Sequence, residues 1–401
     1  MGQRFQIIAP RAHVALTTQA KLGEVLFDES FSSQLVYLLA IPVRPPLLSA
    51  NDSAVQRTTV DTVENMRDAA GHGKKRKADD EILVPVDAPS SKQAKTSDAV
   101  RALHRRTTTA FCDFPGEIHR LIFAQFEDVL DIVNLGATSQ YFWAIAREFL
   151  EDFAISFVGQ WAGEKIVFVG ENVEQDDYPP GLFTAEERDD LRLQKGPAAM
   201  DDWDRDYSTE PFTLYHFSHP SVCETEDSET EPSSALTQLI VELSRRYPEK
   251  EDTYPCTVLT GLYRMMMRRN PYFPQDQPWI LRNLTTKQFV RSEAIALKPE
   301  FIHGPFIRGL GFAQVVMSRI CWSSSNFVSI EDPTNISRGV WAGHCFDITT
   351  RTRHEEQTKG GQGWEDASDQ VAEEIASIWE SNLGPDWREE VCEDASRYRL
   401  S

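Results

Sequence analysis

The feature that most constrains the fold of this chain is a long stretch without aromatic residues, which a single compact core cannot include. Residues 49–108 are dominated by Asp, Ser, Thr, Lys and Ala, and they contain no Phe, Trp or Tyr. No apolar periodicity runs through them, so they bury too little surface to offset the entropy lost on ordering. We predict a flexible linker over residues 49–110, between an ordered segment at 1–48 and a longer part that begins at residue 111.

A short basic cluster lies inside this stretch and consists of Lys74, Lys75, Arg76 and Lys77. A basic cluster in a flexible segment is a candidate nuclear-localisation signal. The same residues are equally compatible with a charge run that only keeps the segment solvated. Both interpretations stay open at the level of sequence.

Composition restricts the compartment and the partners. The chain has 401 residues, enough for two or more domains, and a formal net charge of −21. This charge repels phosphate backbones and anionic bilayers, so we expect neither a nucleic-acid nor a membrane partner. The six cysteines form no CxxC pair, as is typical of free thiols in a reducing compartment. We therefore expect an intracellular protein of the cytoplasm or the nucleus.

The N-terminal segment, residues 1–48, has the pattern of an ordered piece. Phe5, Ile7 and Ile8 indicate a strand that ends before Pro10, and apolar residues near helical spacing indicate a helix from about Ser30. The segment is too small to bury a core of its own. We expect it to pack on the C-terminal domain.

Residues 113–153 show the clearest helical periodicity. Apolar residues from 118 to 126 fit one short helix, those from 129 to 135 a second, and those from 142 to 153 a third. Asp113 and Pro115 are suitable for a helix start, and Thr138 or Ser139 for an N-cap. We predict a compact module of three helices over residues 111–155.

Residues 156–401 predict a second, mixed domain. Residues 165–169, 279–296, 312–322 and 340–349 are strand-rich, whereas 236–247 and 371–383 fit helices. Residues 171–210 hold 13 acidic and four basic residues and are expected to be loops or solvated surface. The predicted fold class is therefore α+β, a small three-helix module followed by a mixed domain with an antiparallel-type sheet and peripheral helices.

One tripeptide, Trp-Ala-Gly, occurs at residues 161–163 and again at 341–343, each time before a strand-like run. Two copies are too few to predict a repeat architecture from sequence.

The helical module resembles an F-box. The resemblance rests on Phe114-Pro115, Glu117-Ile118, Leu121-Ile122, Asp128-Val129, Ile132 and Leu135, and then on Thr138-Ser139 and Phe142-Trp143. Residues 281–287 and 338–344 are also similar to segments of a group of fungal F-box proteins. Phe114 stands where the family usually has Leu.

The resemblance implies an adaptor that docks the Skp-family linker of a cullin ubiquitin ligase and recruits a protein substrate. It assigns the docking face to eight residues, Phe114, Pro115, Ile118, Ile122, Val129, Ile132, Leu135 and Trp143. The alternative is that these side chains pack on the chain's own C-terminal domain. The protein would then be a non-catalytic scaffold in which the helices are purely structural.

Motifs of catalysis and metal binding do not support an enzyme. The sequence has no phosphate-binding loop, GxSxG elbow or HExxH motif. His216, His219 and Cys223 lack the second ligand pair that a zinc site requires, and Gly360 to Gly363 fit a turn. We expect no cofactor, no metal and no catalytic residue, and an enzyme with an unrecognised site is the third and weakest hypothesis.

Overall fold

The computed structural model describes residues 2–27, 30–44, 111, 114–156, 158–199, 206–226, 272–331, 333–360 and 362–397. The chain divides into two compact units, one made of residues 1–44 and 127–401 and the other of Pro45–Phe126. The fold class is α+β, with mixed sheets. The division between the units falls inside the predicted helical module, after Phe126.

The first unit begins with a hairpin and two helices. Strands β1 (Arg4–Ala9) and β2 (Val14–Lys21) pair antiparallel, and helices α1 (Leu22–Leu26) and α2 (Ser30–Leu39) follow directly. β1 is buried on both faces, which is why its sequence is a nearly continuous apolar run. The predicted strand and helix of this segment are present, and β2 is an additional strand.

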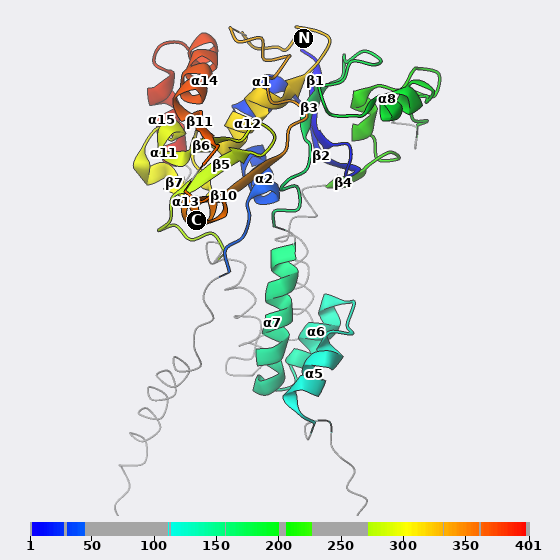
Figure 1. The fold of residues 1–401 in the computed structure, drawn as a ribbon, viewed down its shortest axis with the longest axis vertical. Helices are drawn as coiled ribbons and strands as arrows, with labels where there is room; N and C mark the ends of the chain where they lie inside the picture. The colour runs from blue at the N-terminus through cyan, green and yellow to red at the C-terminus, as the bar shows by residue number, and fades with distance from the viewer. Residues whose placement is uncertain are drawn as a thin grey trace, which may run out of the picture. The chain divides into compact units, whose positions relative to one another are not determined.

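Strand β3 (Val167–Gly170) pairs antiparallel with β1 and completes the centre of sheet A. The order of this sheet is β4-β2-β1-β3-β9, with β4 at Glu224–Glu226 and β9 at Cys321–Trp322. Both edge strands run parallel to their neighbours. The residues that open the chain therefore lie in the centre of a sheet closed by residues far along the sequence (Figure 1).

Sheet B has the order β10-β5-β6-β11. Strands β5 (Trp279–Asn283) and β6 (Gln288–Arg291) form an antiparallel hairpin, followed by helices α11 (Ser292–Ile295) and α12 (Phe312–Ile320). Strand β10 (Phe346–Thr350) pairs antiparallel with β5, and β11 (Glu365–Asp366) pairs parallel with β6. A 3-10 helix (Pro299–Phe301) and the small hairpin of β7 (Ile302–His303) and β8 (Phe306–Ile307) connect α11 to α12.

The two sheets follow one plan. We call residues 2–40 with 158–226 half A, and residues 279–366 half B. Each half has a hairpin, a short helix, a longer helix, a strand antiparallel to the first hairpin strand and a parallel edge strand beside the second. Both hairpin turns place a left-handed residue last, His13 with φ 55° in half A and Lys287 with φ 58° in half B.

The two Trp-Ala-Gly segments lie where the halves meet, and their hydrogen bonds are reciprocal. The Gly163 N–H donates to the Phe346 carbonyl at 2.8 Å, and the Gly343 N–H donates to the Ile166 carbonyl at 2.9 Å. Between them Lys165 and Cys345 form an antiparallel bridge. This mutual exchange is what an approximate two-fold axis produces.

The halves also exchange a short extended segment after the longer helix. Ala40, after α2, bridges parallel to Ile348 of β10, whereas Cys321, after α12, pairs parallel with Phe168 of β3. Sheet A therefore includes strand β9 from half B, and sheet B is joined to Ala40 of half A by an isolated bridge.

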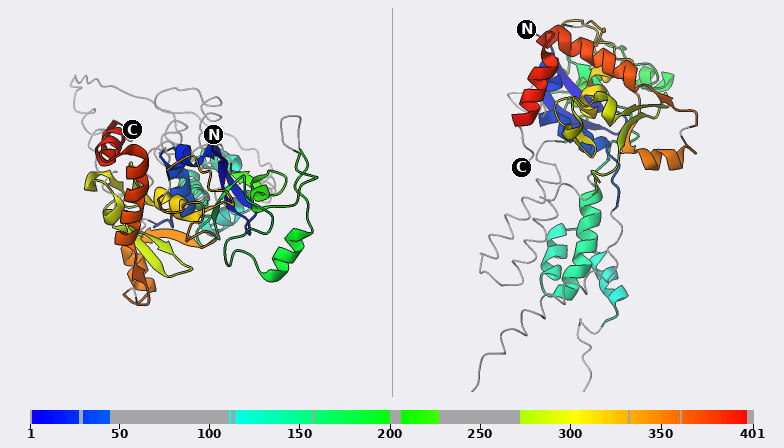
Figure 2. Two further views of the ribbon diagram at one scale, coloured as in Figure 1. Left: turned by 90° about the horizontal axis from the view of Figure 1, so that it is seen from above. Right: turned by 90° about the vertical axis from the view of Figure 1, so that its left-hand side faces the viewer.

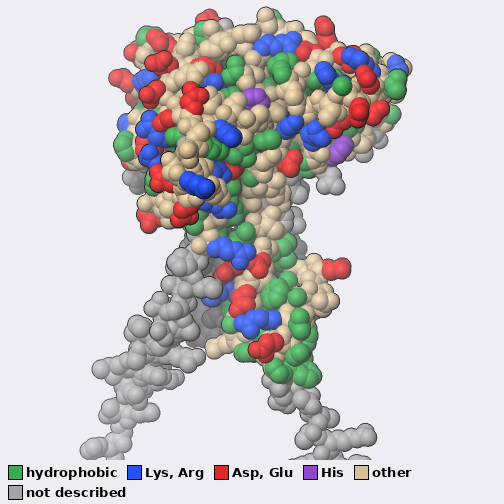
Figure 3. All heavy atoms as spheres, in the orientation of Figure 1, with side chains coloured by type: hydrophobic (Ala, Val, Ile, Leu, Met, Phe, Trp, Pro, Cys, Tyr) green, Lys and Arg blue, Asp and Glu red, His purple; other side chains and the backbone are tan. Residues whose placement is uncertain are grey.

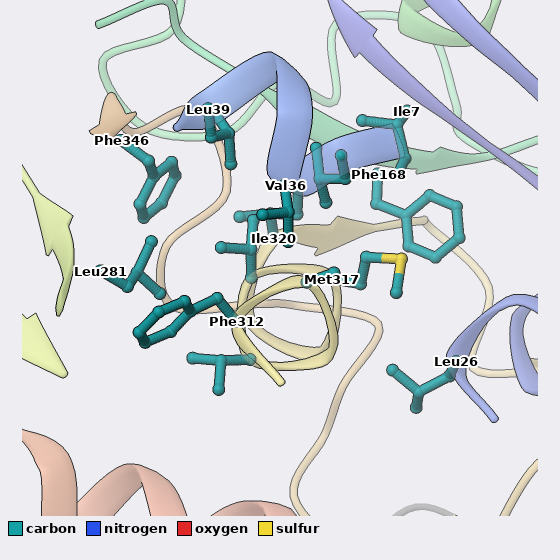
Figure 4. Packing of buried hydrophobic residues seen from close by; sticks show 14 of the residues in the cluster. Ile7, Leu26, Val36, Leu39, Phe168, Leu281, Phe312, Met317, Ile320 and Phe346 are labelled. Carbon is teal, nitrogen blue, oxygen red and sulfur yellow. The ribbon is translucent and has the colours of Figure 1, made fainter. Parts of the chain in front are cut away.

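The main core lies between the two sheets and is filled by α2 and α12, which pack against each other. In Figure 4, Ile7 and Phe168 approach from sheet A, while Leu281 and Phe346 approach from sheet B. Ile7 pairs with Phe168 in register and Leu281 pairs with Ile348, so equivalent positions of both halves face the same core.

Different segments cover the outer faces of the two sheets. Half A uses residues 171–199 and 206–223, with helix α8 (Ala185–Arg192) and a 3-10 helix at Leu214–Ser218, and half B uses α13 (Arg351–Gln357). Helices α14 (Ser368–Leu383) and α15 (Trp387–Arg397) follow sheet B. Seen from above, α8 and the two C-terminal helices lie at opposite ends of this unit (Figure 2).

Several predictions need correction. Residues 312–322 were expected to be strand-rich, but Phe312–Ile320 is helix α12 and only Cys321 and Trp322 are extended. All nine residues of α12 are buried, and the apolar content favoured a strand, although Gln314, Ser318 and Arg319 recur at helical spacing. In the acidic stretch predicted as loops, α8 is a helix that begins at the Thr184–Glu187 capping box.

Other predictions fall on the expected elements. The helix expected at 371–383 is part of α14, and the strand-rich 279–296 and 340–349 contain β5, β6 and β10. The predicted linker, its basic cluster at 74–77 and the helix expected at 236–247 lie outside the described residues.

Candidate protein-interaction surface

Helix α5 (Gly116–Phe123) carries the first part of the predicted docking face. Pro115 is its N-cap residue, where the missing N–H of proline costs nothing. His119 and Phe123, one turn apart, are buried. The ring of His119 is tied to the backbone, with Nε2 2.8 Å from the Phe111 carbonyl oxygen.

Three exposed apolar side chains, which we call the apolar stripe, lie on α5 and just before it. Ile118 and Leu121 are three positions apart on α5 and so share one face of the helix, and Phe114 precedes the N-cap residue Pro115. Their exposed fractions are 40%, 40% and 62%. Hydrophobic side chains gather over the region of α5 in the space-filling view (Figure 3). Because water-facing apolar rows of this kind are rare on monomeric proteins, we treat the stripe as the candidate interaction surface.

Helices α6 (Val129–Gly136) and α7 (Gln140–Ser156) carry the rest of the predicted residues. The Asp128 carboxylate caps α6 by accepting from the Leu130 N–H at 2.8 Å, and the Ser139 hydroxyl accepts from the Phe142 N–H at 3.2 Å at the start of α7. The two helices pack closely. A Cβ built on Gly136 would lie 2.5 Å from the Cβ of Ala146.

The predicted docking residues differ in exposure. Phe114, Pro115 and Ile118 are exposed, whereas Ile122, Val129, Leu135 and Trp143 are half-buried. Ile132 is buried, so it supports α6 and is not available to a partner in this conformation. Sequence reasoning left Leu121 out of the docking face, although its position one turn after Ile118 is a signal that points to it.

The charges around α7 are mostly paired. Arg44 and Asp152 form an ion pair at 2.9 Å, and Arg147 lies 3.4 Å from Glu151 one turn along the helix. Burial raises the pKa of Glu151 above its ordinary value, which Arg147 partly opposes. Exposed pairs of this kind contribute little stability, so this surface is defined by its apolar residues.

The residues weighed as metal ligands have other roles. The Thr213 N–H donates to Nδ1 of His216 at 3.0 Å, and Nδ1 of His219 lies 2.8 Å from the Ser221 hydroxyl. Cys223 is buried in an apolar cluster. Within the described parts of the chain, no group of three or more His, Cys, Asp or Glu side chains is placed to hold a metal ion. Among the described helices, none has the length and hydropathy to span a bilayer.

No protein-family model matches this chain, and neither a curated protein nor a solved structure matches it.

Proposed function

We propose that residues 111–155 act as an F-box-type module, with α5, α6 and α7 as its three helices, and that the remaining domain recruits a protein substrate. The module would dock the Skp-family linker of a cullin ubiquitin ligase. In this proposal the chain is a non-catalytic adaptor. The proposal starts from the resemblance in residues 114–143.

The observation that carries the proposal is the exposed apolar stripe of Phe114, just before α5, and Ile118 and Leu121 on it. Two of its residues belong to the docking face that the resemblance assigns. Each Å² of apolar surface that a partner removes from water contributes about 25 cal/mol to the free energy of binding. A helix row of this form fits the groove or flat helical face of another protein.

The test is binding of the full chain to purified Skp-family linker by isothermal titration calorimetry. The variants are Ile118→Asp and Leu121→Asp, whose exposed side chains make the fold tolerant of the change. If each residue contributes as an interface anchor, we expect each variant to bind at least about 30-fold more weakly, corresponding to about 2 kcal/mol.

Leu193→Asp is the matched control, because Leu193 is 85% exposed and lies at the end of α8, in the other unit. It should bind like the wild-type chain. If the wild-type chain does not bind the linker at about 10 μM, or if all three variants bind equally, the adaptor proposal fails. The scaffold alternative, in which the helices are only structural, then takes its place.

A further inference from the structure

The outer face of sheet B contains a buried ion pair. The Arg282 guanidinium donates from Nε to Asp347 Oδ1 at 2.7 Å and from Nη2 to Oδ2 at 2.6 Å. Its third nitrogen, Nη1, donates to the Gln357 Oε1 at 2.8 Å. The exposed fractions of Arg282 and Asp347 are 5% and 3%, so the pair is removed from water.

The order of strands and helices shared by the two halves does not depend on this ion pair. In half A the register partners Ile8 and Val167 occupy the positions that Arg282 and Asp347 occupy in half B. Ile8 and Val167 belong to an apolar cluster, and half A forms the same sheet with them. A buried ion pair is often no more stabilising than well-packed apolar side chains. Its presence in one half alone therefore calls for a reason other than folding.

His354 lies beside the pair and is the second unusual group. It is 3% exposed, and neither of its ring nitrogens has a hydrogen-bond partner. Its ring packs between Phe289, at 5.3 Å between centroids, and the edge of Trp364, at 5.0 Å. Leaving such a group buried without a partner costs about 1–3 kcal/mol, a cost that a phenylalanine at this position would not have.

The segment that carries His354 is a short helix that ends in left-handed turns. Helix α13 has two turns, and the Thr350 hydroxyl caps it by accepting from the Arg353 N–H at 3.3 Å. After α13 the backbone takes left-handed conformations at Lys359, Gly360 and Gly363, and both glycines face open space. We call α13 together with Trp364 the cover. Gln357 and Trp364 contact Arg282, and His354 contacts Phe289.

We propose that the cover is an acid-released latch, which stays closed over Arg282 and Asp347 while His354 is neutral and opens when its ring takes up a proton. Opening unwinds α13, which withdraws Gln357 from Arg282 Nη1 and uncovers the ring of Phe289. The freed guanidinium nitrogen and the aromatic ring would then be available to another molecule. The device is independent of the adaptor proposal.

Burial and the charges around His354 together determine whether acid opens or closes the cover. Arg282 on β5 and Arg351 on α13 disfavour a proton on the ring, whereas Asp347 on β10 and Glu355 on α13 favour it. Burial is the largest influence, and with Arg282 it lowers the pKa of His354 below the ordinary 6.5. An opened cover releases the ring to water, where it regains its ordinary proton affinity. Protons therefore favour the open form.

Hydrogen–deuterium exchange of the full chain at pH 7.5 and 5.5, corrected for intrinsic rates, measures this opening. The reporters are the N–H groups of Thr358 and Gly360, which donate to the carbonyls of His354 and Glu355. If the closed ring does not protonate in this range, their opening should increase by up to about tenfold at pH 5.5. Amides in the centre of β5 should not change.

His354→Phe is the deciding variant, because it keeps an aromatic ring at this site and leaves Arg282, Asp347, Arg351 and Glu355 in place. It should remove the pH dependence of the α13 amides. The same tenfold change in this variant, or no change in the wild-type chain, would overturn the proposal. Should the variant not fold, NMR titration of the wild-type ring decides: a midpoint below 6.5 agrees with the latch, and a midpoint at or above 6.5 excludes it.

Discussion

Half A and half B build their sheets in the same order and cover the outer faces in opposite ways. In half A, Leu182, Phe212 and Phe217 pack with Ile8 and Val167, which gives a second apolar core. In half B the short helix α13 and Trp364 lie over Arg282 and Asp347. The strands beneath are equivalent, but the chemistry above them is not.

The comparison shows that the fold requires apolar residues on the inner faces of the sheets but not on the outer faces. The inner positions, Ile7 with Phe168 and Leu281 with Ile348, are apolar in both halves, because they face the shared core. The outer positions vary with the segment that covers them. Burial of the inner faces therefore specifies the shared order of strands and helices, whereas residues on the outer faces can differ and serve binding or regulation.

The largest expected effect comes from breaking the ion pair of half B. Asp347→Ala leaves Arg282 buried without its counter-charge, and we expect a loss of about 3–5 kcal/mol in the free energy of unfolding. Urea denaturation followed by far-UV circular dichroism measures it.

The matched variant copies half A into half B, with Arg282→Ile and Asp347→Val together. Because it removes both charges and supplies the side chains of Ile8 and Val167, most of the lost stability should return. If the double variant is as unstable as Asp347→Ala, the outer faces are not interchangeable and the comparison is wrong.

The glycines of the two Trp-Ala-Gly segments should give the next largest effect. Gly163 has φ 89° and Gly343 has φ 77°, so alanine at either position is strained by about 1–2 kcal/mol. A Cβ at Gly163 meets no atom within 4 Å, whereas at Gly343 it lies 3.3 Å from the side chains of Leu182 and Pro179.

We therefore expect both Gly→Ala variants to lower the thermal midpoint, with Gly343→Ala lowering it more. His13→Gly and Lys287→Gly are the controls, since glycine removes the backbone strain of a left-handed residue in the equivalent turns of the two halves. Their effects should be small and alike. Opposite effects would show that the turns are not equivalent.

A smaller effect should follow from pH. Burial lowers the pKa of both His344 and His354, with Lys165 adding to the first and Arg282 to the second. In the unfolded chain both rings bind a proton near pH 6.5, so stability falls as the pH drops below that value. Each ring should contribute at most about 1.4 kcal/mol between pH 7.5 and 5.5.

Urea midpoints at several pH values measure this loss for the wild-type chain and for His354→Phe with His344→Asn. The double variant should have a flatter profile from pH 7.5 to 5.5. An unchanged profile would assign the pH dependence to carboxylates instead.

The smallest effect concerns reactivity without a change in stability. Cys223 belongs to the outer core of half A, where burial raises the pKa of its thiol to about 12. Cys345 and Cys392 are partly exposed. With iodoacetamide at pH 8, Cys223 should react roughly a hundredfold more slowly than these two. Mass spectrometry of labelled peptides checks it, and comparable rates would show that the outer core of half A opens readily.

Local patterns were sufficient for elements with one dominant period. The helices expected near residue 30 and at 371–383 could be predicted because each presents a polar face beside an apolar one. The same holds for α5, which the spacing of the apolar residues from 118 to 126 predicted. How far each of these side chains is exposed could not be read in this way, as the burial of Ile132 shows.

By itself the sequence determined the α+β class and several of the elements, since these depend on neighbours along the chain. The tertiary structure decided that α12 is buried on all sides, although its polar residues Gln314, Ser318 and Arg319 recur at helical spacing. It also decided that the two Trp-Ala-Gly segments meet and that Arg282 lies against Asp347. These pairings join residues 65 or more positions apart, and only the packing of the two sheets brings them within hydrogen-bonding distance.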